Sequence, residues 1–286
     1  MSEGGNVDSM DKLHGVTDFS ALTSYSWNVF RYLGDYMHLA GVIVLLLTMA
    51  KNQSCAGLSM RTQVIYFLIF VTRYLDLFDH NQTAYLVFFK LTYIATSALS
   101  LVVFTQMQGT YERQKDTCNI VIILAACFVA AILLTNELTV LETLWTYSEF
   151  LEGFAMVPQY IFCYRDTTKD SGVTMYVIFL GGYRVFYALN WIYKKYKMPQ
   201  YMDVQSWIGG LVDIAFFLDY LNYRFRGASI LRSMVLRVDE KINEISDKVE
   251  LKVLGTQSSS ARVAKDGQEI RRRRGGRSEE TESLEV

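Results

Sequence analysis

Seven apolar stretches dominate the first 226 residues, and several of them contain charged side chains. They cover residues 31–50, 62–78, 84–105, 118–135, 142–163, 174–193 and 205–224, and each is roughly long enough to cross about 30 Å of hydrocarbon as a helix. A charge at that depth is costly unless it faces a partner or a watery cavity. The chain therefore predicts an all-α membrane protein whose seven transmembrane helices surround a polar pocket for a charged ligand.

Composition excludes several function classes. Hydrophobic residues make up 51% of the 286 residues, as in a membrane protein with soluble ends. The formal net charge is −1, so no global field favours nucleic acid. We find no nucleophile–histidine–carboxylate set, metal-ligand motif or phosphate-binding loop. We therefore expect no enzymatic activity, no catalytic residue, no metal and no cofactor.

The chain divides into four parts. Residues 1–26 are polar, lack the apolar core of a cleavable signal peptide and are expected to form a lumenal leader. Residues 27–226 hold the seven helices, residues 227–254 form an amphipathic or coiled-coil cytosolic helix, and residues 255–286 form a disordered charged tail. The third part carries a heptad seam at Leu231, Val235, Val238, Ile242, Ile245 and Val249. Such a seam fits a helix lying on the bundle or the membrane, or a coiled-coil dimer.

Orientation follows from lysine and arginine in the short loops. These residues gather after the first, third and fifth stretches, and again beside the last stretch at Arg224, Arg226 and Arg232. The excess predicts a lumenal N-terminus and a cytosolic C-terminus. Three lysines after the sixth stretch run against this bias.

A short repeat indicates how the helices are grouped. AGLSM follows the first stretch and SGVTM follows the fifth, and each precedes an apolar run with an adjacent tyrosine and arginine. We interpret this as two parallel three-helix units joined by the fourth helix, an arrangement in which ligands bind where the units meet.

The first stretch places three ionisable residues on one face. Arg31, Asp35 and His38 stand at i, i+4 and i+7 of a helix. Histidine changes charge between pH 5 and 8 without special help. His38 is therefore a candidate for pH-dependent binding.

Acidic and basic residues also face each other from the fifth and sixth stretches. Glu142, Trp145, Glu149 and Glu152 form one stripe, and the sixth stretch supplies Tyr183, Arg184, Tyr187, Trp191 and Lys194. Glu152 and Arg184 come to similar depth if these helices are antiparallel neighbours, so we predict an ion pair between them. In the second stretch, Arg73 and Asp76 could instead pair with each other at i and i+3.

These charges favour a short peptide ligand of mixed charge. Arg31, Arg73 and Lys194 all lie toward the lumenal side, and an arginine fork matches a carboxylate bidentately. Asp76 and Glu142 would meet a cationic part of the ligand, and Trp145 would cover it. A peptide with a free C-terminus uses every one of these charges.

The same residues carry a family resemblance. WNVFRYLGDYMHLAG, SCAGLS, RYLDLF, LETLWTYS, FLEGFAMVPQ, GGYRVFYALNWIYK and FFLDY resemble, in this order, the motifs of the ER lumen protein-retaining receptors, also called KDEL or HDEL receptors. The resemblance covers about residues 27–226. It implies a fold of SWEET or PQ-loop type, with a pair of three-helix bundles joined by a linker helix.

The resemblance also implies a function. Such receptors bind the C-terminal tetrapeptide of escaped ER lumenal proteins in the acidic Golgi, return them to the ER in COPI vesicles and release them at neutral pH. They reside in the ER and cis-Golgi membranes as multi-pass proteins. A small-solute transporter of the PQ-loop or SWEET type is the alternative, because it shares the helix layout.

Roles for individual residues follow from the motif match. The resemblance implies ligand binding by Arg31, Arg73, Tyr74, Asp76, Glu142, Trp145, Trp191 and Lys194, and a pH switch of His38, Glu152, Tyr183, Arg184 and Tyr187. Asp219 matches an aspartate tied to transport. Two departures stand out: Lys194 replaces an arginine, and Glu149 replaces an apolar residue. Because lysine lacks the arginine fork, we expect weaker capture at that position.

Overall fold

Every element described in the structure is a helix. The structure is a computed structural model that describes residues 28–78, 84–135, 137–166, 170–249 and 252, so the predicted leader 1–26 and the charged tail 255–286 lie outside the described residues. The α-helices before residue 227 are α2 (Val29–Asn52), α3 (Met60–Arg73), α4 (Ala84–Gln106), α5 (Ile120–Leu134), α6 (Val140–Phe154), α7 (Val157–Arg165), α8 (Ser171–Lys197) and α9 (Val204–Arg226). Two short 3-10 helices, η1 (Leu75–Phe78) and η2 (Gln108–Thr110), follow α3 and α4.

The predicted fifth span, 142–163, is wrong as a single helix. It is divided into α6 and α7, with the break just before Pro158. Proline has no N–H to donate into a helix, and it favours the first turn of a new one. The polar groups at this break are satisfied by the start of α3, since the backbone N–H of Gln159 donates to Thr62 Oγ1 at 3.0 Å and the N–H of Ser59 donates to Gln159 Oε1 at 2.8 Å.

Four of the described helices are long and apolar enough to cross a membrane. These are α2, α4, α8 and α9, while α5 is apolar but shorter. Helices α3 and α6 contain 14 and 15 residues, fewer than the roughly 20 that a straight crossing needs. Length and composition therefore identify a multi-span membrane protein, and the count of seven spans remains a prediction.

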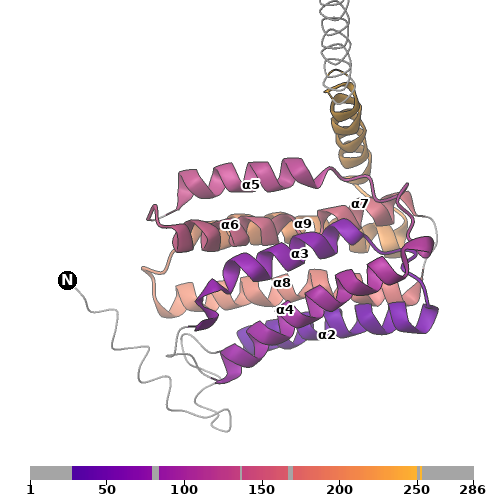
Figure 1. The fold of residues 1–286 in the computed structure, drawn as a ribbon. Coiled ribbons are helices and arrows are strands. Elements are labelled where there is room, and N and C mark those ends of the chain that lie inside the picture. The colour runs from indigo at the N-terminus through magenta and orange to yellow at the C-terminus, as the bar shows by residue number, and fades with distance from the viewer. Residues whose placement is uncertain (1–27, 79–83, 136, 167–169, 250–251, 253–286) are drawn as a thin grey trace, which may run out of the picture. The chain divides into compact units, whose positions relative to one another are not determined.

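Tight pairs of helices hold the bundle together. Helix α2 packs along α8 and α6 packs along α9, while α3 contacts both α4 and α6 (Figure 1). Helix α5 packs against α6 at one edge of the bundle. Helices α6 and α9 approach so closely that a Cβ atom added to Gly153 would lie 2.5 Å from the Cα atom of Gly209. This close approach brings the acidic stripe of α6 beside the first turns of α9.

The chain divides into two compact units, and the division falls between Leu236 and Arg237. Helix α9 ends at Gly227, whose φ of 74° is a left-handed conformation that glycine adopts readily. Residues 232–249 are helical, as the heptad seam predicts. In the first unit, Val235 of this seam is buried against Ile161 and Cys118. A coiled-coil dimer of the tail stays a prediction.

Candidate ligand site in a charged cavity

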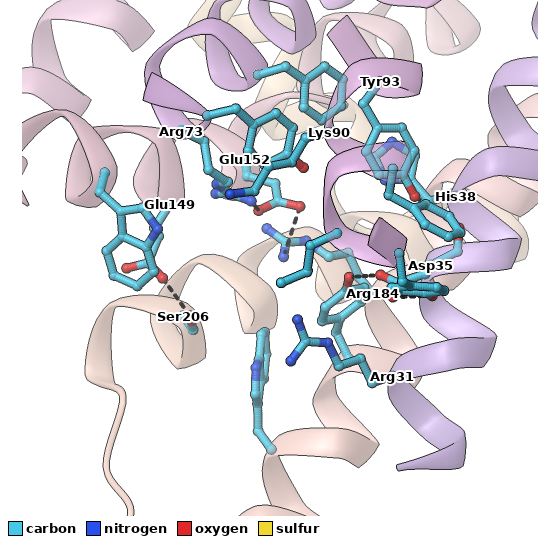
Figure 2. A pocket seen from close by; sticks show the side chains of 18 residues that line it. Arg31, Asp35, His38, Arg73, Lys90, Tyr93, Glu149, Glu152, Arg184 and Ser206 are labelled. Carbon is cyan, nitrogen blue, oxygen red and sulfur yellow. Dashed lines mark hydrogen bonds and ion pairs between the residues drawn. The ribbon is translucent and has the colours of Figure 1, made fainter. Parts of the chain in front are cut away.

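A cavity of about 280 Å³ opens between six helices, and charged side chains line it (Figure 2). The cations are Arg31 of α2, Arg73 of α3, Lys90 of α4 and Arg184 of α8, and the acids are Asp35 of α2 and Glu149 and Glu152 of α6. Ser206 of α9 completes the wall beside Glu149. Because ionisable groups of both signs converge from separate helices, the cavity suits a ligand that is itself charged.

Glu152 lies at the centre of the charge network. Its Oε2 is 2.5 Å from Arg73 Nη1, and its Oε1 is 3.4 Å from Arg184 Nη1. The hydroxyl of Tyr183 also donates to Glu152 Oε1 at 2.7 Å. The predicted ion pair between Glu152 and Arg184 is therefore confirmed, and Arg73 joins it from α3.

A second buried carboxylate, from α9, pairs with Arg184. Asp213 of α9 is 1% exposed, and its Oδ2 lies 3.4 Å from Arg184 Nε. Two guanidinium groups thus face two buried carboxylates. Such a cluster is held in place by its own charge balance, because removing one member leaves an uncompensated charge in a buried position.

His38 is enclosed by aromatic rings. Its ring centroid lies 4.6 Å from that of Tyr93 and 4.5 Å from that of Tyr183, with nearly parallel planes. Its Nε2 is buried and has no hydrogen-bond partner among the described residues. The Nε2 atom of His38 is therefore available for a hydrogen bond or a proton. It belongs to the same cavity wall as Glu152.

Tyrosines hold the neighbouring Asp35. The hydroxyl of Tyr187 donates to Asp35 Oδ1, and that of Tyr85 donates to Oδ2 at 3.1 Å. The capping of α2 also orients this face, since Asn28 accepts from the backbone N–H of Phe30 at 3.1 Å and donates to Asn190 of α8 at 2.7 Å. Arg31, Asp35 and His38 all line the cavity, so their predicted common face is confirmed.

Besides His38 Nε2 and Arg184 Nε, two further polar atoms of the cavity wall have no hydrogen-bond partner in the described part of the chain. They are Arg73 Nη2, a donor, and Glu149 Oε2, an acceptor. Arg73 is otherwise occupied by Glu152 and by Ser148, whose Oγ accepts from Arg73 Nε at 2.9 Å. Buried polar atoms without partners are uncommon, and these two are available to bond with a molecule in the cavity.

Most of the predicted site residues meet at this cavity. The lining includes Arg31, His38, Arg73, Tyr74, Trp145, Glu152, Arg184, Tyr187 and Trp191, and Tyr183 stands behind His38. Glu142 and Lys194 do not line it. Glu142 lies in the first turn of α6, three residues before Trp145, and the ammonium of Lys194 lies 5.4 Å from the ring centroid of Tyr201. The side chain of Asp76 is outside the described part.

Sequence reasoning missed two buried charges. Lys90 is 8% exposed, lines the cavity and lies 5.7 Å from the ring centroid of Tyr74. Asp213 pairs with Arg184 as described above. Both stand alone in apolar stretches, YLVFFKLTYIAT and LVDIAFFL. An ionisable residue in such a stretch is a sign of a functional site, and this signal was present in the sequence.

Asp219 lies away from the cavity. It accepts hydrogen bonds from Tyr164 Oη at 2.6 Å, from the hydroxyl of Ser229, and from the backbone N–H of Ile230 at 2.8 Å. These bonds fix the turn that follows α9. A role for Asp219 in transport stays a prediction.

Comparisons with known proteins agree on one family. The family model of the ER lumen protein retaining receptor matches residues 54–194. ER lumen protein-retaining receptor B of Arabidopsis thaliana is 38% identical over 202 residues, which are 69% of this chain and 94% of the relative. The receptor of Drosophila melanogaster is 34% identical over 194 residues, 68% of this chain and 91% of the relative. ER lumen protein-retaining receptor 3 of Xenopus laevis is 36% identical over 194 residues, which are 68% of this chain and 90% of the relative.

Proposed function

This chain belongs to the family of ER lumen protein-retaining receptors, and from that membership we propose that it binds the C-terminal KDEL- or HDEL-type signal of escaped ER lumenal proteins. It captures them in the Golgi and returns them to the ER in COPI vesicles. The family consists of receptors, not enzymes. The protein is a multi-pass membrane protein of the secretory pathway, and we place it in the ER and cis-Golgi membranes with a lumenal N-terminus and a cytosolic C-terminus.

One observation supports this proposal more than any other. Arg73 lines the cavity, and its Nη2 atom is buried there without a hydrogen-bond partner among the described residues. A guanidinium with a free N–H edge binds carboxylates strongly, because the bond is charge-assisted. Arg31 and Lys90 add positive charge to the same cavity. The terminal carboxylate of a peptide is the group that this arrangement suits best.

The remaining predicted residues are assigned to the ends of the peptide. Trp145 and Trp191 line the cavity, and their rings offer stacking surfaces for the peptide chain. Lys194 lies one helical turn beyond Trp191, and Glu142 lies one turn before Trp145. We assign Lys194 to the approach of the carboxylate, and Glu142 with Asp76 to the basic end of the signal.

The seven-span arrangement belongs to the same proposal. In it, α6 and α7 together form the fifth span, and α5 links two three-helix units. The contacts of α5 with α6 at the edge of the bundle support this role of α5. Exposed apolar side chains along α5, such as Val121, Phe128 and Leu133, fit contact with lipid.

Peptide binding and solute uptake distinguish the receptor from a transporter. We expect the purified full-length protein to bind free-acid KDEL and HDEL peptides and to reject peptides of the same composition in shuffled order. We expect proteoliposomes containing it to take up labelled sugars and amino acids no faster than empty liposomes. Uptake above that background, together with equal binding of ordered and shuffled peptides, would favour the transporter.

We propose that peptide binding strengthens as pH falls, because His38 takes up a proton together with the ligand. The ionisable groups around His38 are Tyr66 and Arg73 of α3, Tyr93 of α4, Glu152 of α6, and Tyr183 and Arg184 of α8. Two guanidinium groups already place positive charge there. A protonated imidazole is therefore favoured when a carboxylate arrives, and by linkage the protonated receptor binds the carboxylate more tightly.

Replacing His38 by phenylalanine is expected to flatten the pH profile. Phenylalanine keeps the ring stack between Tyr93 and Tyr183 but cannot take up a proton. One coupled proton changes affinity by up to about tenfold per pH unit, so the wild type should bind more tightly at pH 6 than at pH 7 by up to about that factor. We expect His38→Phe to change by less than about twofold over the same range, measured by calorimetry. A variant that keeps the wild-type profile contradicts the role of His38.

A further inference from the structure

Glu149 is a buried acid of the cavity that the proposed function does not use. It is 8% exposed, and its Oε1 accepts a hydrogen bond from Ser206 Oγ of α9 at 3.0 Å (Figure 2). Its Oε2 has no partner among the described residues. A buried carboxylate that accepts only one hydrogen bond, from a neutral hydroxyl, is energetically unfavourable. A ligand that donates a second hydrogen bond or brings a positive charge would stabilise it.

The backbone around Glu149 is held rigidly. A Cβ atom added to Gly209 of α9 would lie 3.3 Å from the carbonyl oxygen of Glu149 and 3.4 Å from the Cα atom of Gly153. The helices thus touch through their backbones at this point. Glu149 cannot turn away from the cavity by a shift of α6 without opening this contact, and the bond from Ser206 fixes its rotamer.

Arg73 compensates the charge of Glu149 only in part. Its guanidinium acts favourably on Glu149, but its Nη1 and Nε bond to Glu152 and Ser148. Arg184 is shared between Glu152 and Asp213. Asp203 and Glu152 add negative charge around Glu149. This part of the wall is therefore an acidic site beside the basic one.

We propose that Glu149 binds a basic side chain of the peptide, and this inference rests on the proposed function above. Arg73 and Glu149 present an unpartnered donor and an unpartnered acceptor to one cavity, which fits a ligand with a carboxylate and a cation close together. Trp145 lies one turn before Glu149 on the same helix and lines the same cavity. A carboxylate next to an aromatic ring is a favourable environment for an ammonium group.

A double-mutant cycle, in which a side chain of the peptide and Glu149 of the receptor are changed separately and together, tests this proposal. The peptides are free-acid tetrapeptides in pairs, with lysine or its uncharged isostere norleucine at each of the three positions before the terminal residue. Their affinities are measured for the purified full-length receptor and for Glu149→Gln, which keeps the shape and the bond from Ser206. Glu149→Leu is a second variant that fills the same space without a polar group. Glu137→Gln, an exposed acid before α6, is the matched control.

At one of the three peptide positions, we expect the wild type and Glu137→Gln to bind the lysine peptide about tenfold or more tightly than the norleucine peptide. A ratio of this size is typical of a charge-assisted contact. In Glu149→Gln and Glu149→Leu, this preference should fall to less than about twofold. Because each ratio is taken on one preparation, a lower folded fraction cancels out.

Two results would overturn the inference. If the lysine preference is the same in the wild type and both Glu149 variants at every position, Glu149 serves only the contact between α6 and α9. That result leaves the proposed function standing. If the wild type binds none of the free-acid peptides, the proposed function itself is contradicted, and the role of Glu149 is contradicted with it.

Discussion

Replacing Arg73 by methionine is expected to weaken binding of a KDEL-type peptide by about 100-fold or more. A hydrogen bond to a charged group contributes about 1.5–3 kcal/mol, and Arg73→Met also removes a positive charge that faces the terminal carboxylate, so we expect a loss of about two orders of magnitude in affinity. Arg73 is the residue of choice for this test because its Nη2 is buried at the cavity without a partner among the described residues. Binding to the purified protein at acidic pH provides the measurement.

Two further variants define what Arg73 contributes. Arg73→Lys keeps the positive charge but loses the planar fork, so we expect an affinity between those of the wild type and Arg73→Met. Arg113→Met removes an exposed arginine outside the cavity and should bind as the wild type does. If Arg73→Met binds within about threefold of the wild type while still folded, the carboxylate does not bind at this guanidinium.

Replacing Glu152 by glutamine is expected to have the largest effect on stability. Glu152 pairs with both Arg73 and Arg184 and accepts from Tyr183. Removing one partner of a buried ion pair costs about 3–5 kcal/mol, because the remaining charges stay buried. We expect the thermal midpoint in detergent, measured without ligand, to fall by on the order of 10 °C.

The matched control is another glutamate of the same helix. Glu142 is half-exposed in the first turn of α6, and Glu142→Gln should change the midpoint by no more than about 1–2 °C, as expected for a surface substitution. A Glu152→Gln protein as stable as this control would mean that the charge network does not stabilise the bundle. Arg184→Met offers an independent check, because it removes the arginine that pairs with Asp213 and leaves Glu152 paired with Arg73.

The sequence predicted those parts of the site that follow from helical spacing. Arg31, Asp35 and His38 stand at i, i+4 and i+7, and this spacing alone places them on one face. The pair of Glu152 and Arg184 was also predictable, since two opposite charges at similar depth in apolar helices have few other partners. The boundaries of the long helices α2, α4 and α9 came within a few residues, because the apolar length of a full crossing is nearly fixed by the bilayer.

Other features depend on which helices touch, and spacing does not contain that information. The stack of His38 between Tyr93 and Tyr183 joins α2, α4 and α8. Lys90 stands alone in an apolar stretch of the sequence, and only the packing of α4 shows that it lines the cavity. The division of the fifth stretch was readable from Pro158, but only contacts between Gln159 and α3 explain why the break is stable there.

The central claim is that cations from separate helices, which line one cavity, bind the terminal carboxylate of a peptide. Its most direct test compares one KDEL peptide as the free acid and as the C-terminal amide, which removes the negative charge and little else. We expect the purified full-length receptor at acidic pH to bind the amide about 100-fold more weakly than the acid, or not at all. Equal affinity for the two peptides would contradict the account.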